Sequence, residues 1–304
     1  AYGVSPAMRQ RVEETIERLG YRPRTAARVM RGQSFTIGFE TPNVSHGIHS
    51  LVIDGAADEL AGSAYQLVVV PGLARIPAQQ ILEALVDRQV DGIIATASEV
   101  PASSIERLAR HTPIVVLGRH DDSPAFDTII NDDVAGTDLV MDHLLELGHT
   151  RIAHLTIHPS TDQSPHFFRL NQYLARMIGA GLTPNVHYVE ETDAGAYGVA
   201  AALLATTPRP TAIFAGHDSL AMGVLRASAE AGLDPSTLSV VGYDNIELAG
   251  HPLISLTTVD LQGAETGRLA IKLILERVNG RTEARHECFQ PQLRIRRSSG
   301  PAAG

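Results

Sequence analysis

From Phe35 onward the chain alternates short apolar segments with amphipathic ones, and this alternation constrains the fold more than any other feature. Segments such as LVVV and DGIIAT have no polar face, as expected of parallel strands covered by helices on both sides. Strands are predicted at 35–39, 65–70, 91–96, 114–117, 128–131, 151–157, 211–215 and 238–243. The pattern predicts right-handed strand–helix–strand units and a doubly wound α/β architecture.

The segments between most of these strands place their apolar residues on one helical face. Helices are predicted at 50–63, 77–89, 103–111, 133–148, 169–181, 194–206, 218–232 and 263–279. A chain of 304 residues is long for one compact domain. This number of strand–helix units therefore fits two sheets better than one.

The N-terminal segment has a different pattern. Residues 5–19 are predicted to form a helix that Ser5 caps, with Pro6 at its first position and Gly20 at its end. Its apolar face consists of Met8, Val12, Ile16 and Leu19. A second short helix is predicted from Thr25 to Arg31, followed by a linker at 32–34.

Charge is distributed unevenly along the chain. Residues 1–31 contain seven Arg and three Glu, a balance of +4, whereas the remaining 273 residues have a balance of −13. A basic arm on an acidic body indicates a nucleic-acid partner that binds one end of the molecule. Charge alone is equally compatible with a solvated, arginine-rich helix.

The bulk composition excludes several classes of protein. No run of about 18 apolar residues is present, so no membrane span is predicted. The N-terminus has no apolar core typical of a secretory signal. The single cysteine, Cys288, excludes an intrachain disulfide and fits a reducing compartment. We therefore expect a cytoplasmic protein.

Several segments, taken in order, resemble the LacI/GalR family of transcription regulators. They include VSPAMRQRVEETIERLGYRPRTAARVMR, TPIVVLGR, AIFAGHDSLAMGVL, LSVVGYDNIELAGHPLISLTTV, LRIRRSS and the block from DDVAG to HLLELGHTRIAHL. Each is weak alone, but their joint order over roughly 300 positions is specific. The resemblance implies a DNA-binding regulator, most often a repressor, that acts as a homodimer without a cofactor.

The family resemblance also implies a domain organisation. Residues 1–34 resemble the end of a helix-turn-helix domain and its hinge helix. Two doubly wound parallel-sheet lobes of periplasmic-binding-protein type are expected to follow, formed by 35–131 with 263–290 and by 132–262 with 291–304. The family's first two helices would precede Ala1, so we expect this polypeptide to lack the helix that reads the major groove.

The hinge segment is the expected contact with operator DNA. In the family this helix lies in the minor groove and inserts an apolar side chain between base pairs. Met30 stands where the family usually has leucine, and the arginines of the segment can contact phosphates. The residues expected at DNA are Tyr21, Thr25, Ala27, Arg28, Met30 and Arg31.

A small-molecule effector is expected between the lobes, at the carboxyl ends of the strands. Arg169 and Asp244 match family positions that bind it, and a guanidinium facing a carboxylate suits a polyol such as a sugar. The expected site also contains Asp132, His217, Ile48, His49 and Asn131. Arg169 could instead pair with Asp132 or Asp244 in a purely structural role.

Departures from the family leave the chemistry of the effector open. The family's Asn-Pro-Phe-Phe motif reads His46-Gly47-Ile48-His49 here, and the chain has no Trp, so an aromatic wall is missing. The added histidines are compatible with an anionic or phosphorylated ligand held by Arg169. A plain sugar bound through water, or a site that has lost small-molecule binding, fits equally.

Other functions have weaker support in the sequence. The thirteen histidines form no HExxH motif and no Cys/His quartet, so no metal site is predicted. GxSxG, Walker and GxGxxG motifs are absent, which argues against an enzyme. A solute-binding receptor of similar two-lobed fold is the alternative, but we expect such a receptor to have a secretory signal and no basic hinge.

Overall fold

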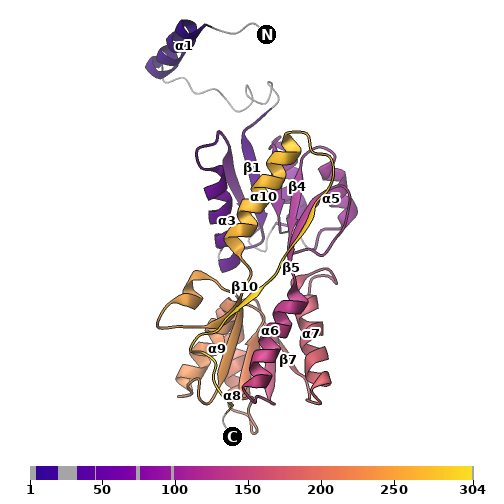
Figure 1. The fold of residues 1–304 in the computed structure, drawn as a ribbon, viewed down its shortest axis with the longest axis vertical. Coiled ribbons are helices and arrows are strands. Elements are labelled where there is room, and N and C mark those ends of the chain that lie inside the picture. The colour runs from indigo at the N-terminus through magenta and orange to yellow at the C-terminus, as the bar shows by residue number, and fades with distance from the viewer. Residues whose placement is uncertain (1–4, 20–32, 45, 73–75, 97–98, 303–304) are drawn as a thin grey trace.

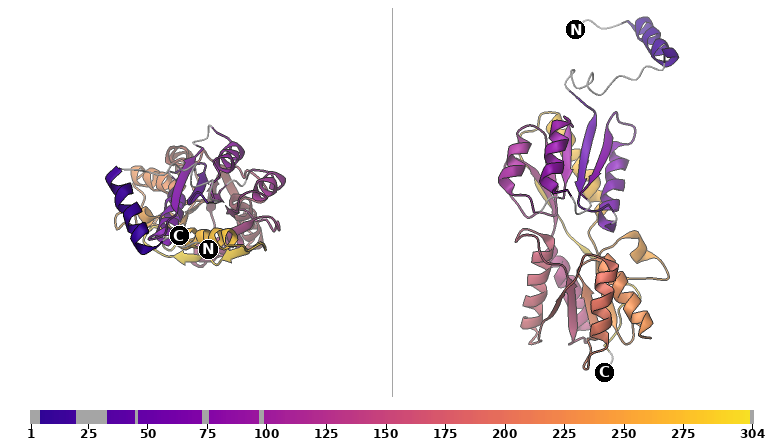
Figure 2. Two further views of the ribbon diagram at one scale, coloured as in Figure 1. Left: turned by 90° about the horizontal axis from the view of Figure 1, so that it is seen from above. Right: turned by 180° about the vertical axis from the view of Figure 1, so that it is seen from behind.

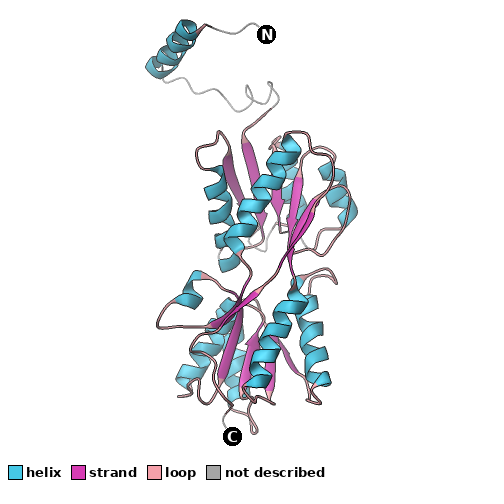
Figure 3. Cartoon of the chain, in the orientation of Figure 1, coloured by secondary structure: helices cyan, strands magenta, loops and turns pink. Residues whose placement is uncertain are grey.

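The computed structural model describes residues 5–19, 33–44, 46–72, 76–96 and 99–302, and shows two lobes stacked along the long axis of the molecule (Figure 1). Each lobe contains a six-stranded sheet between layers of helices (Figure 3). The prediction of two doubly wound α/β lobes is therefore confirmed.

The N-terminal lobe has the strand order β11-β5-β4-β3-β1-β2, with all neighbouring strands parallel. Its strands are β1 (Thr36–Thr41), β2 (Gln66–Pro71), β3 (Gly92–Ala95), β4 (Ile114–Leu117), β5 (Asp127–Asn131) and β11 (His286–Phe289). Its helices are α3 (Gly47–Leu60), α4 (Ala78–Asp87), α5 (Ala102–Ala109) and α10 (Gly263–Val278).

The C-terminal lobe has the order β12-β10-β9-β8-β6-β7, in which β12 runs antiparallel to β10. Its strands are β6 (Ile152–Thr156), β7 (Asn185–Tyr188), β8 (Ala212–Ala215), β9 (Ser239–Asp244), β10 (Thr257–Asp260) and β12 (Gln292–Arg294). Its helices are α6 (Asp133–Glu146), α7 (Pro165–Gly179), α8 (Asp193–Leu204), α9 (Asp218–Glu230) and the short η1 (Glu247–Gly250).

Both sheets are buried on two faces because successive side chains of a strand point to opposite sides. In the N-terminal lobe, Ile94 and Val115 pack with α3 and α10, whereas their neighbours Ile93 and Ile114 pack with α4 and α5. In the C-terminal lobe one face is covered by α8 and α9 and the other by α6 and α7. This explains why the strands are continuously apolar.

Four strands were not predicted from the sequence: β7, β10, β11 and β12. Each has only three or four residues and lacks a continuous apolar run, since β10 reads TTVD and β11 reads HECF. Helix α7 also begins earlier than predicted, at Pro165, which supplies a favourable first helical residue.

The chain crosses between the lobes three times: from β5 to α6, from β10 to α10 and from β11 to β12. The view from behind shows the crossing segments between the two stacked lobes (Figure 2, right). The carboxyl ends of the parallel strands of both sheets consequently meet where the lobes face each other.

Helix α1 (Pro6–Leu19) agrees with the predicted N-terminal helix, and the backbone N–H of Met8 donates a 3.4 Å hydrogen bond to Ser5 Oγ. Its apolar face, which includes Met8 and Leu19, is exposed. The predicted hinge helix and its expected DNA contacts, Tyr21, Thr25, Ala27, Arg28, Met30 and Arg31, lie outside the described residues. No described helix is both long enough and apolar enough to cross a membrane.

The contact between α3 and α10 depends on glycine. A Cβ at Gly267 would lie 2.0 Å from the Val52 carbonyl oxygen, whereas a Cβ at Gly198, in the interior of α8, would meet nothing within 4 Å. We predict that Gly267→Ala lowers the free energy of unfolding by about 1–3 kcal/mol through overpacking. Gly198→Ala should raise it by about 0.5–1 kcal/mol. Urea unfolding measures both, and equal effects would contradict this account of the helix contact.

The buried carboxyl of Glu40, on β1, makes the free energy of unfolding depend on pH. Burial raises the pKa of its carboxyl from 4.5 to about 7, partly offset by the hydrogen bond from the Thr96 N–H. Between these pH values the folded state keeps a proton that the unfolded state has released. The free energy of unfolding should therefore fall as pH rises through this window, by up to about 3 kcal/mol.

The variant Glu40→Gln should lose this contribution to the pH slope. Glu247→Gln, at an exposed position on η1, is the matched control and should keep the wild-type slope. Thermal unfolding at a series of pH values from about 4.5 to 7 provides the measurement. A wild-type slope in Glu40→Gln would show that another group is responsible.

Candidate functional site

A cavity of about 380 Å³ lies between the lobes and is lined by residues of both. Its walls come from strand ends and helix starts, the position at which open α/β sheets bind ligands. Ile48, Leu117, Ile129 and Leu261 supply apolar surface, and a small set of polar groups converges among them. This composition and size are typical of a small-molecule site.

Most of the residues predicted for the site lie together in this cavity: Arg169, Asp244, His217, Ile48, His49 and Asn131. Asp132 is the exception. Its carboxylate accepts a 2.9 Å hydrogen bond from the Ala135 N–H and caps the N-terminus of α6. The next residue, Asp133, lines the cavity instead.

Arg169 is the central charge of the site. It lies one turn into α7, on the helix face shared with Tyr173 and Met177, and is 5 % exposed. Its Nε donates to Asp133 Oδ1 and its Nη1 donates to the Gly216 carbonyl, both at 2.8 Å. The guanidinium carbon also stands 3.8 Å from the centre of the Tyr243 ring.

The partner of Arg169 is therefore Asp133, and neither of the two carboxylates considered from the sequence forms this ion pair. Burial alone would lower the pKa of Arg169, but the charge of Asp133, followed by Tyr243 and Asp244, raises it. The guanidinium thus stays charged in a nearly solvent-free position.

Asp244 ends β9 with its backbone in the left-handed region, at φ 111°. Its Oδ2 is buried and has no hydrogen-bond partner among the described protein atoms. Burial raises the pKa of this carboxyl well above its usual range, and Arg169 counteracts only part of the effect. A protonated Asp244 can both donate a hydrogen bond and accept one, which suits a hydroxyl ligand.

Four histidines surround the polar end of the cavity: His46, His49, His166 and His217. Burial lowers the pKa of each, to about 3 for His46 and well below the usual range for His166 and His217. Their imidazoles are therefore neutral at physiological pH. His49 Nδ1 lies 2.8 Å from Thr41 Oγ1 and 2.9 Å from the Asn43 carbonyl oxygen.

The cavity residues that were not predicted from the sequence include Asp133, His166 and Glu191. Asp132 and Asp133 are adjacent at the start of α6, and the geometry of the N-cap decides which of the two faces the cavity. His166 belongs to a first turn of α7 that the sequence did not place in a helix. Glu191 follows the unpredicted strand β7, and no motif marks it.

The ion pair between Arg169 and Asp133 predicts that removing Arg169 alone lowers the free energy of unfolding more than removing both charges. Arg169→Leu leaves Asp133, 2 % exposed, without its guanidinium partner and with only the 3.2 Å contact to His120 Nε2, and should cost about 3–5 kcal/mol of unfolding free energy. Adding Asp133→Asn to this variant should restore part of the loss, because the stranded charge is gone. Urea unfolding at neutral pH measures both changes.

A matched control lies on the same helix. Arg176 pairs with Asp138 and Asp142 at the protein surface, so Arg176→Leu should cost less than about 1 kcal/mol. If Arg169→Leu were no more costly than Arg176→Leu, the buried pair would not have the role assigned to it here.

Comparisons with known proteins agree with this architecture. Residues 141–299 match the family described as periplasmic binding protein-like domain. The ribose operon repressor of Escherichia coli (strain K12) is 32% identical over 283 residues, which cover 90% of this chain and 85% of the repressor. The HTH-type transcriptional repressor PurR of Photobacterium profundum is 29% identical over 304 residues, covering 97% of this chain and 90% of PurR.

A solved structure has the same fold. It is a LacI family transcriptional regulator from Enterococcus faecium with bound ribose, with a TM-score of 0.78 and 26% sequence identity. The similarity covers 88% of this chain and 100% of that one. Together with the extent of similarity to the ribose operon repressor, these findings show that the chain belongs to the LacI/GalR family of transcriptional regulators.

Proposed function

We propose that this chain is a DNA-binding repressor whose affinity for its operator is controlled by a sugar or sugar derivative bound between the two lobes. The observation that carries the proposal is the cavity itself, in which Arg169 and Asp244 converge between apolar walls from both lobes. A cytoplasmic location is part of the same proposal, because the operator is there.

The polar groups of the cavity suit a polyhydroxylated ligand. Asp244 Oδ2 and Asn131 Oδ1 are buried without a protein partner, and both can accept hydrogen bonds from hydroxyl groups. Arg169 uses Nε and Nη1 for protein contacts, which leaves Nη2 as a donor to the ligand. Ile48, Leu117 and Ile129 can cover the less polar face of a sugar ring.

The mechanism we propose is a shift between two arrangements of the lobes. The lobes, 35–131 with 263–290 and 132–262 with 291–304, would move as units about the three crossing segments. A ligand that contacts both lobes favours the closed arrangement, by no more than its difference in affinity for the two states. Closure would change the spacing of two hinge helices and hence their fit to the operator.

A homodimer is part of this mechanism, since two-fold symmetry matches a palindromic operator. Val68 on the edge strand β2 and Ile76 beside it are 43 % and 50 % exposed, and they provide apolar surface for a second copy. The DNA contacts proposed are those of the hinge segment: Tyr21, Thr25, Ala27, Arg28, Met30 and Arg31.

The first test is thermal unfolding of the protein with a panel of sugars, polyols, sugar phosphates and nucleosides. A ligand at about 100 times its dissociation constant adds roughly 2.7 kcal/mol to the free energy of unfolding. The stabilisation should be lost in Asp244→Ala, which removes both hydrogen-bonding oxygens and strands no charge, because Asp244 has no ion-pair partner among the described residues. Asp54→Asn, at an exposed position on α3, should respond as the wild type does.

A second measurement tests regulation. Operator sequences are selected from random DNA with a chain that carries a complete helix-turn-helix domain before the hinge segment, and the affinity for the selected DNA is compared with and without the stabilising ligand. A change of about fivefold or more is expected of allosteric coupling. An unchanged affinity would refute effector control, and ligand binding without any DNA selection would favour a solute-binding receptor.

A further inference from the structure

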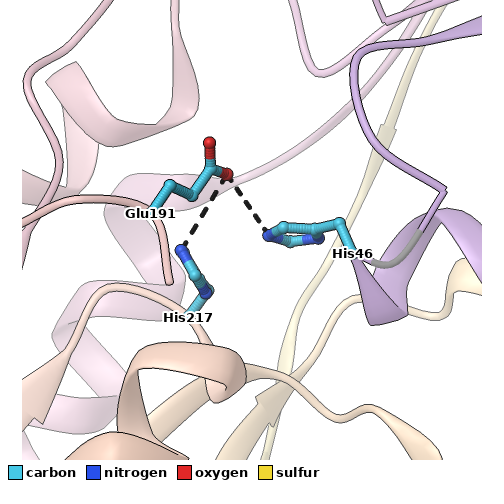
Figure 4. A group of neighbouring side chains, drawn as sticks. All are labelled: His46, Glu191 and His217. Atoms are coloured by element: carbon cyan, nitrogen blue, oxygen red, sulfur yellow. Dashed lines mark ion pairs between the residues drawn. The ribbon is translucent and has the colours of Figure 1, made fainter. Parts of the chain in front are cut away.

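Three side chains with metal-ligating atoms meet at the cavity, and they come from both lobes. His46 directly precedes α3, Glu191 lies in the loop between β7 and α8, and His217 directly precedes α9. Figure 4 shows both imidazoles directed at one oxygen of the carboxylate. Glu191 Oε1 is 3.6 Å from His46 Nε2 and 4.0 Å from His217 Nε2, and the three ligand atoms lie within 4.8 Å of one another.

The histidine on the C-terminal lobe has unsatisfied polar atoms. His217 is 1 % exposed, and neither ring nitrogen has a hydrogen-bond partner within the described protein. His46 Nδ1 is likewise buried and unpartnered. Leaving a buried donor or acceptor unsatisfied costs free energy, and each such group in a native structure calls for an explanation. Here Nε2 of His217 is directed at Glu191 Oε1, as Nε2 of His46 is.

The charge of the cavity favours a cation at this point. Arg169 is the only arginine or lysine among the described residues that line the cavity, and Asp133 already neutralises it. The lining also contains the carboxyl groups of Glu99 and Glu191, in addition to the protonated Asp244. The negative charge therefore comes from Glu99 and Glu191. A bound anion would add to this negative charge, whereas a dication would compensate it.

We propose that His46, Glu191 and His217 bind a divalent transition-metal ion of the zinc class, which links the two lobes. Two neutral imidazoles and one carboxylate are a ligand set that suits zinc, with bond lengths of about 2.0–2.2 Å. Such bonds place ligand atoms roughly 3–3.5 Å apart. The three ligand atoms lie within 4.8 Å of one another, so shifts of about 1–1.5 Å or less are needed to complete the site.

Three protein ligands leave at least one coordination position for water or for an oxygen of the effector. This metal site is a proposal beyond effector control by a sugar. Metal occupancy can be measured without DNA and without any sugar, so the two proposals are tested separately. A metal that joins His46 of one lobe to Glu191 and His217 of the other stabilises the closed arrangement directly.

The test is calorimetric titration of the full chain, freed of metal with a chelator, with zinc chloride in a large excess of Mg²⁺. We expect one Zn²⁺ per chain and no competition from Mg²⁺, which prefers oxygen ligands. Glu191→Gln and His217→Gln should each weaken binding at least tenfold. Glu191 is half exposed in a loop, so its variant is expected to fold even if His217→Gln does not.

His158→Gln is the matched control, because His158 also lines the cavity but stacks on Tyr188 and is not one of the three ligands. It should bind Zn²⁺ as the wild type does. The proposal is overturned by the absence of one-to-one binding, by wild-type affinity in Glu191→Gln, or by equal loss in His158→Gln.

Discussion

The buried pair of Arg169 and Asp133 is the interaction on which the electrostatics of the cleft depend. A guanidinium this far from solvent is tolerated only with a nearby opposite charge and several hydrogen-bond acceptors. Asp133 and the Gly216 carbonyl provide these from two other segments of the C-terminal lobe. The positive charge acts on its surroundings, lowering the pKa of His46, His166 and His217 in addition to the effect of burial. It also makes Asp244 more acidic than burial alone would allow.

The two lobes contribute different chemistry to the cleft. The C-terminal lobe supplies Arg169, Asp133 and the carboxyl of Asp244, whereas the N-terminal lobe supplies Glu99 and apolar surface such as Leu117 and Ile129; histidines come from both lobes. A ligand held by the charged groups of one lobe therefore offers its remaining surface to the other. This division fits a cleft in which contact with the second lobe follows contact with the first.

The sequence was sufficient for the architecture because both sheets are buried on two faces, and such strands are apolar throughout. Strands such as β4 and β8 could be located within a residue or two for this reason. The strands that return from the end of the chain, β11 and β12, have no such pattern, since their pairing depends on partners far away in the sequence. Periodicity within one segment contains no information about these partners.

The candidate site was predictable where a residue matches a position of the family's binding site, as Arg169 and Asp244 do. It was not predictable where a choice between neighbours depends on local geometry. Asp132 and Asp133 are chemically identical, but the N-cap position takes the first and directs the second into the cavity. Glu191 approaches His46 and His217 only after β7 has paired with β6, a contact that no local pattern signals.

The return of the chain to the N-terminal lobe has a consequence for how the protein folds during synthesis. Strand β11 pairs with β5, so that His286 lies beside Thr128, and α10 covers a face of the first sheet. A ribosome that has made only the first half of the chain has therefore produced a sheet with an unpaired edge and an uncovered apolar face. Such contacts between distant segments slow folding, and exposed edges promote aggregation. The N-terminal lobe becomes complete only when nearly the entire polypeptide has been released, which makes it the part of the nascent chain with the greatest need for chaperones.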